Sequence, residues 1–185
     1  ASGWAENGQL HVPTSGYWTG LAAPTETQPL DGAVSTLAIG YHAPSIFARL
    51  DGTETGVYGL FSPDNNVARI RRVVNGNAST ILTSIYVDFQ PDHWYEMTFE
   101  FAGNDLHLKI EDMSSGNVWD LYATDGNAHP GEVGLATGQE PEAVFEWFSL
   151  DVEGDAELDA FDVDDDNVGW SSGDGDGAFE AGESV

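Results

Sequence analysis

The sequence predicts an all-β fold: a two-sheet antiparallel β-sandwich of the jelly-roll type with an acidic C-terminal extension. Three observations support this. Apolar residues recur with period two in short runs, turn residues such as Gly, Asp, Asn and Pro separate the runs, and no run has the 3.6-residue period of a helix. About ten such runs with turn signals roughly every 8–12 residues are typical of a sandwich or barrel. The 185 residues are enough for one hydrophobic core.

The predicted strands follow one another from residue 34 to residue 152. In the first, residues 34–42, the alternation puts Leu37, Ile39 and Tyr41 on one face. A later one, residues 106–111, has leucine and isoleucine at every even position and polar residues between them. The other expected strands are residues 46–50, 56–61, 68–74, 81–87, 94–101, 118–123, 132–136 and 143–152.

Charge is the strongest compositional signal. The chain has 32 acidic and 5 basic residues, a formal net charge of -27. Such a surface repels itself at low ionic strength, but at about 1 M salt the Debye length falls to about 3 Å and the repulsion is screened. We therefore expect a protein of a halophilic archaeon or its virus. Nucleic acid is excluded as a partner because no positive surface is available to displace its counterions.

Two absences exclude further classes. The chain has no cysteine, so disulfides, thiolate catalysis and sulfur-ligated metals are excluded. No apolar run approaches the roughly 18 residues of a membrane-spanning helix, so we expect no membrane insertion.

The composition changes near Gly154, where Asp, Glu and Gly become dominant. We therefore divide the chain into a β-sandwich at 1–153 and an acidic extension at 154–185. Alternating carboxylates in the extension suggest Ca²⁺, which takes 6–8 oxygen ligands; the alternative is a solvated acidic surface. The candidate calcium ligands are Asp162, Asp164, Asp166, Asp174 and Asp176.

Six segments follow one another along the predicted sandwich: WAENGQL at 4–10, ARIR at 68–71, HWYEMTF at 93–99, GNDLHL at 103–108, GEVGLA at 131–136 and VFEWFSL at 144–150. Their order and spacing resemble the concanavalin A-like lectin/glucanase superfamily in its laminin-G-like branch. In that family a WY strand, a G-x-[LI]-x-[VL] strand, a G-x-V-G-L turn and a closing aromatic strand follow in this order, and here the similarity covers residues 4–153. The resemblance implies a jelly roll that binds glycans or surface ligands on a concave face or at the loop rim.

One departure concerns the family's opening strand, of the type F-x-D-D-F. It has no counterpart ahead of Trp4, whereas a similar string, LDAFDVDDDNVGW, occupies residues 158–170. This extension either supplies the missing strand to its own domain or completes the next subunit by strand addition at an unpaired edge. The alternative is coincidence in an acid-rich segment.

Catalysis is not the main prediction. Glucanases of this superfamily use an E-x-D-x-E strand, which Glu153, Asp155 and Glu157 imitate, but small residues separate these acids and they follow the closing strand. The sequence has no G-x-S-x-G, H-E-x-x-H or phosphate-binding loop.

Ligand binding is predicted from side chains that suit sugars. The aromatic candidates for a binding rim are Tyr17, Trp18, Tyr58 and Trp119, which lie near turns; their alternative role is core packing. Arg69 and Arg71 share one strand face and could present guanidinium groups to an acidic sugar, or simply pair with nearby carboxylates. Asn77 begins an N-A-S sequon and is a candidate N-glycosylation site.

The functional prediction is a non-catalytic, extracellular module that binds carbohydrate or mediates adhesion at a cell or virion surface in high salt. The alternative is a structural subunit of a filament, surface layer or virion appendage that associates with itself through its C-terminal segment. A glucanase-like glycoside hydrolase is a distant third.

Overall fold

The computed structural model describes residues 4–6, 9–12, 19–22, 31–51, 53, 55–137 and 143–151. Side chains are described from residue 31 onward in these ranges, except at 78 and 79. The predicted acidic extension, residues 154–185, lies outside the described residues. Among the residues that are described, no helix is long and apolar enough to cross a bilayer.

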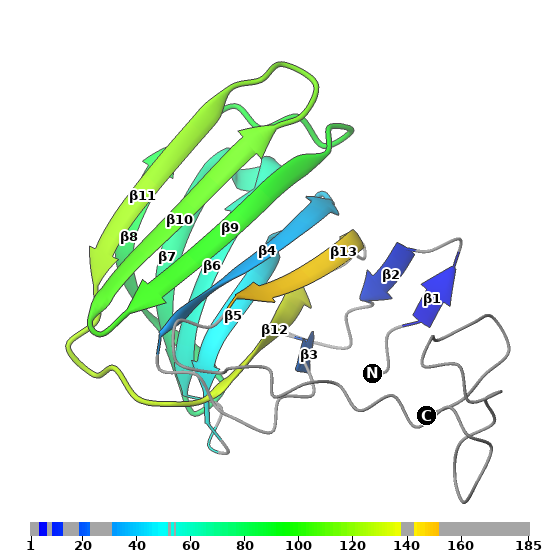
Figure 1. Ribbon diagram of the computed structural model, residues 1–185. Coiled ribbons are helices and arrows are strands. Elements are labelled where there is room, and N and C mark those ends of the chain that lie inside the picture. Colours follow the sequence, from blue (N-terminus) through cyan, green and yellow to red (C-terminus); the bar gives the residue numbers. More distant parts are fainter. Residues whose placement is uncertain are drawn as a thin grey trace, which may run out of the picture. The chain divides into compact units, whose positions relative to one another are not determined.

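The described chain forms two antiparallel sheets (Figure 1), which confirms the predicted all-β sandwich. A one-turn 3₁₀ helix, Pro63–Asn65, follows one strand. In spatial order, the seven-stranded sheet is β1 (Trp4–Glu6), β2 (Gln9–Val12), β13 (Ala143–Asp151), β4 (Gly32–Ile39), β9 (Tyr95–Ala102), β10 (Asp105–Asp112) and β11 (Val118–Thr124). The six-stranded sheet is β3 (Thr19–Ala22), β12 (Glu132–Thr137), β5 (Pro44–Leu50), β6 (Gly56–Ser62), β7 (Val67–Val74) and β8 (Asn77–Tyr86).

One hydrophobic core fills the space between the sheets. Phe99 and Leu108 of the seven-stranded sheet and Ile70 of the six-stranded sheet belong to the same buried cluster. The sheets approach closely at Gly59, where an added Cβ would lie 3.0 Å from Leu108 Cδ1. Because each fully buried Phe, Leu or Ile contributes about 1.5–3 kcal/mol, this shared interior is what holds the two layers together.

Burial alternates along both β10 and β4, but only in β10 does the sequence also show which face is buried. In β10, Leu106, Leu108 and Ile110 are buried, as predicted. In β4, Leu37 and Ile39 lie on one half-buried face, and the alternate positions Val34, Thr36 and Ala38 are fully buried. Both faces of β4 carry apolar residues, so period two cannot identify the inner one; Val34 and Ala38 belong to the buried cluster that the two sheets share.

Two long strands end the sheets on the same side of the sandwich. β11 is the last strand of the seven-stranded sheet and β8 the last of the six-stranded sheet, and they lie side by side in Figure 1. The β10–β11 hairpin runs the length of the sandwich. Asp112, the last residue of β10, and Asp125, which follows β11, therefore lie at opposite ends.

Candidate functional site

A pocket opens at the end of the sandwich where β5, β7 and β11 finish. Its volume is about 140 Å³. Gly56, Val57 and Val74 supply apolar lining, and polar lining comes from Arg49, Arg72, Asp125, Asn127 and His129. Three separate chain segments therefore converge here: the start of β6 with the residues before it, the end of β7, and the connection between β11 and β12.

An ion pair between Arg72 and Asp125 organises the pocket. Asp125 is 3% exposed, and its Oδ1 also accepts a hydrogen bond from the backbone N–H of Asn127 at 3.0 Å. With the Asn127 amide oriented to satisfy its neighbours, its side-chain oxygen accepts from Arg72 Nη1 at 2.7 Å. The backbone N–H of Asp125 donates to the carbonyl of Asn104 at 2.7 Å. The guanidinium of β7 thus holds the connection that follows β11 in the opposite sheet.

Arg49 forms the inner wall of the pocket. Its side chain is 1% exposed, and its guanidinium carbon lies 5.6 Å from the centroid of the Phe101 ring. Burial lowers the pKa of Arg49, and the nearby charge of Asp31 partly offsets this. A Cβ at Gly131 would collide with the Arg49 backbone, so only glycine fits there. The wall is therefore set by close packing and not by a flexible loop.

Basic side chains outnumber acidic ones in the pocket lining, the reverse of the chain as a whole. Two arginines face one aspartate in the lining, whereas the chain as a whole carries a formal net charge of -27. The pocket is also smaller than the roughly 300–1,000 Å³ of drug-sized sites. It therefore suits one small ring or one terminal group that offers several hydroxyl or acidic oxygens.

The structure brings the predicted arginines together. Arg69 and Arg71 lie two residues apart on β7, opposite Leu60 and Tyr58 of β6, which confirms that they share one face. Gly59 lies between Tyr58 and Leu60 on β6, and its added Cβ would point into the core. The residues on either side of it, and the arginines opposite them, therefore face outward from the six-stranded sheet. Burial, and secondarily the charge of Arg69, lower the pKa of Arg71. Whether these two side chains bind a ligand stays a prediction.

The predicted aromatic residues do not gather at one rim. Tyr58 is 6% exposed and packs against Phe47, with ring centroids 5.8 Å apart. Trp119 packs against the core from the other sheet, its ring 5.1 Å from that of Phe89. Both rings are occupied by packing, and their role in binding stays a prediction. Tyr17 and Trp18 lie outside the described residues.

Two tyrosines that the sequence argument passed over are well exposed. Tyr86 at the end of β8 is 83% exposed and Tyr122 on β11 is 69% exposed. Both follow an inward-facing apolar residue in their strand, so strict alternation could have identified them as outward-facing.

The other predicted sites have different outcomes. Asn77 is exposed at the first position of β8, and its side chain donates to the Asn75 carbonyl at 2.9 Å; its glycosylation stays a prediction. The five candidate calcium ligands and the acids at 153, 155 and 157 lie outside the described residues. Within the described part of the chain, no group of three or more His, Asp or Glu residues is placed to hold a metal ion.

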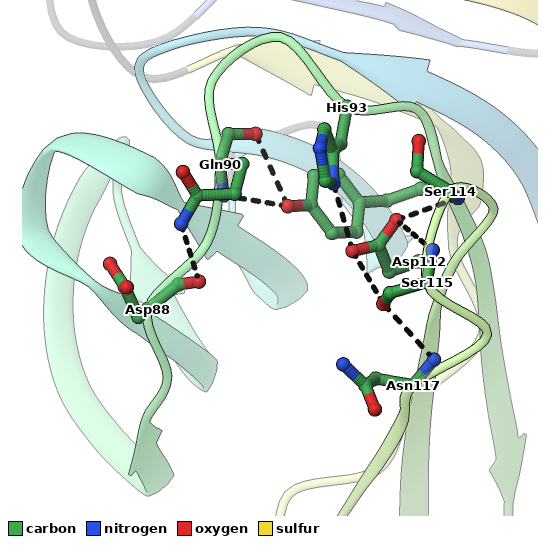
Figure 2. Close-up of polar contacts among 8 residues, drawn as sticks. Asp88, Gln90, His93, Asp112, Ser114, Ser115 and Asn117 are labelled. Carbon is green, nitrogen blue, oxygen red and sulfur yellow. Dashed lines mark hydrogen bonds and ion pairs between the residues drawn. The ribbon is translucent and has the colours of Figure 1, made fainter.

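A second polar cluster, at the end opposite the pocket, contains histidine, serine and aspartate (Figure 2). His93 Nδ1 lies 2.9 Å and Ser115 Oγ 2.8 Å from the same oxygen, Asp112 Oδ2. In a nucleophilic triad the serine would bond to the imidazole, with the aspartate behind it. Here both groups donate to the carboxylate, so the cluster closes a turn and does not activate a nucleophile.

No family model matches this sequence, and no curated protein matches it. Solved structures do. The carbohydrate binding module CBM66 from Bacillus subtilis aligns with a TM-score of 0.68 and 14% identity over 81% of this chain and 91% of that one.

Two further solved structures are also similar. The Ca²⁺-bound exoplasmic/lumenal domain of VIP36 gives a TM-score of 0.62 and 11% identity over 82% of this chain and 81% of that one. The winged bean acidic lectin complexed with methyl-α-D-galactose gives a TM-score of 0.58 and 12% identity over 79% of this chain and 87% of that one. All three are concanavalin A-like jelly rolls. At these identities the likeness establishes the fold, and the fold of this chain is the concanavalin A-like jelly roll that its sequence resembles.

Proposed function

We propose that this chain is a non-catalytic carbohydrate-binding domain whose ligand occupies the pocket between Arg72, Asp125 and Asn127. The observation that carries the proposal is the pocket itself, with guanidinium, carboxylate, amide and imidazole groups converging over apolar lining at a loop end. The neighbours support it, since their titles describe a carbohydrate binding module and a lectin with a bound galactoside.

The chemistry of the lining suits a sugar. A sugar ring presents hydroxyl groups that both donate and accept, so it needs acceptors and donors side by side. Asp125 supplies an acceptor, Arg72 supplies donors, and the exposed Asn127 supplies both. The ion pair keeps these groups in fixed positions before the ligand arrives, which reduces the entropy cost of binding.

The setting follows from the charge. We propose an extracellular, high-salt environment at a cell or virion surface, because 32 acidic residues keep the surface hydrated there while salt screens their repulsion. Calcium is proposed only for the acidic extension, where the five alternating aspartates supply oxygen ligands in the sequence.

The test is glycan-array binding in about 1 M salt, where the Debye length is about 3 Å. For the best sugar, Asn127→Ala and His129→Ala should each weaken binding about fivefold to tenfold, the loss of one hydrogen bond to the ligand. Asn117→Ala is the matched control: Asn117 is exposed in the loop at the other end, and only its backbone makes the hydrogen bonds found there.

Three outcomes separate the alternatives. Binding that Asn127→Ala weakens and Asn117→Ala spares supports the pocket. Binding that only Arg69→Gln and Arg71→Gln weaken moves the site to the outer face of the six-stranded sheet. No binding to any sugar in high salt contradicts the proposed function.

A further inference from the structure

β8 is a long sheet edge without any charged side chain. It has ten residues and pairs with β7, and it is the last strand of its sheet in the described chain. Residues 73–87 contain no Asp, Glu, Lys or Arg, although 20% of the chain is charged. Another uncharged stretch, residues 32–48, forms the inner strands β4 and β5, where burial explains it. For β8 burial is no explanation, because side chains along it are exposed.

The exposed side chains of β8 are apolar or hydroxylic. Tyr86 is 83% exposed and Ile81 is 49% exposed, and Thr80 and Ser84 are also exposed. A free edge presents unpaired backbone N–H and C=O groups, and proteins usually protect it with charged side chains, proline or a very short strand. β1 and β3, the edges at the other side, have three and four residues. β8 has none of these three protections. Its pairing with β7 shifts register twice, between Ile70 and Arg71 and between Arg72 and Val73, but continues to both ends of the strand.

We propose that β8 is a self-association edge, where two copies of this chain pair their β8 strands antiparallel into one continuous sheet. A free edge needs another strand as partner. Of the two long free edges described, β11 carries Asp120, whose side chain is 43% exposed, whereas β8 is neutral. Pairing β8 with β8 is self-complementary about a twofold axis and brings no charge into contact with another.

The overall charge selects this edge and makes the association depend on salt. Two copies with a net charge of -27 each repel one another wherever their acidic surfaces meet. Salt at about 1 M screens that repulsion beyond about 3 Å, and backbone hydrogen bonds and apolar contact along β8 are not weakened by it. Dimerisation should therefore strengthen as salt rises, opposite to an interface held by ion pairs. The inference does not depend on sugar binding.

The test is analytical ultracentrifugation of the full chain in about 0.05 M and about 1 M salt, spanning Debye lengths of more than 10 Å to about 3 Å. We expect monomer at low salt and a concentration-dependent dimer at high salt. Ile81→Glu places two carboxylates at the twofold contact and should weaken the dimer at least tenfold. Ile81→Gln has nearly the same shape without the charge and should leave dimerisation within about threefold of the native chain.

Met113→Glu is the matched control, because Met113 is 52% exposed in the β10–β11 turn and the charge change is the same. It should dimerise like the native chain. Circular dichroism confirms that each variant is folded, and Ser84→Glu replaces Ile81→Glu if that variant is not. A monomer at every salt and protein concentration overturns the proposal. So does a dimer that is equally strong in Ile81→Glu and Ser84→Glu, since association would then use another surface.

Discussion

The two ends of the β10–β11 hairpin both contain a buried aspartate. Asp125 lines a pocket, whereas Asp112 is enclosed by a turn. Asp112 is 4% exposed and Asp125 is 3% exposed, so each needs a full set of donors. Asp112 takes its donors from nearby residues: the backbone N–H of Ser114 at 2.8 Å, the hydroxyl of Ser115 at 2.8 Å and the ring of His93 at 2.9 Å. Asp125 is neutralised by Arg72, which comes from the opposite sheet.

This difference shows how the reach of the donor decides what a buried carboxylate builds. Short local donors draw the backbone around Asp112 and close the turn, as Figure 2 shows. The long side chain of Arg72 reaches Asp125 from β7, so the backbones of β7 and of the segment after β11 stay apart. The space between them is a cavity of about 140 Å³. A buried carboxylate that needs donors is therefore enclosed by a tight turn at the Asp112 end and lines a pocket at the Asp125 end.

Of the substitutions at the two ends, Arg72→Met, at the pocket, should lower the free energy of unfolding most. It keeps an apolar stem but leaves the Asp125 carboxylate buried without its cation, which costs about 3 kcal/mol of unfolding free energy. Urea unfolding at neutral pH measures this. Adding Asp125→Asn to the same chain removes the unpaired charge and should recover part of the loss. A double variant no more stable than Arg72→Met would argue that the ion pair does not carry the effect.

Asp112→Ala should have a smaller effect, about 2 kcal/mol, because the donors it leaves include no guanidinium and are partly reachable by water. The informative measurement compares stability with sugar binding. Asp112→Ala should lower stability and leave binding unchanged, since the pocket lies at the other end, whereas Arg72→Met should lower both. Loss of binding in a folded Asp112→Ala chain would show that the two ends are not independent.

The sequence predicts the strands of the packed sandwich better than it predicts the pocket. Alternation identifies β10 because its two faces differ sharply, apolar at Leu106 and Leu108 and polar at His107 and Lys109. It cannot identify the inner face of β4, where both faces carry apolar residues. The fold class therefore follows from the pattern as a whole, while the side of an individual strand depends on the opposite sheet.

The pocket has no local signature in the sequence. Arg72 and Asp125 are far apart along the chain, and only the packing of β7 and β11 against each other from opposite sheets brings them together. Sequence reasoning singled out Arg69 and Arg71 of the same strand because they share one face. It passed over Arg72, which lies on the other face of β7, opposite the core residue Val57. An ion pair across two sheets becomes visible only once the topology is known.

Ser115→Ala should have the smallest effect on stability, and it tests how much one hydrogen bond to Asp112 contributes. Burial alone would raise the pKa of Asp112, but hydrogen bonds from His93, Ser114 and Ser115 lower it overall. A lowered pKa in the folded state means that this carboxylate stabilises the fold above its unfolded pKa of about 3.9, and that the stabilisation is lost as the pH falls through the folded pKa.

Removing the Ser115 hydroxyl should raise the pKa of Asp112 in the folded chain toward its ordinary value and cost up to about 1 kcal/mol at neutral pH. The two chains should become equally stable below the folded pKa, where the carboxyl is protonated in both. Carbon-detected NMR titration reads the pKa, and urea unfolding across the acid range reads the stability. A stability gap that persists in acid would mean that the hydroxyl stabilises the turn through packing or the Asn117 backbone, and not through the carboxylate that distinguishes this end from the pocket.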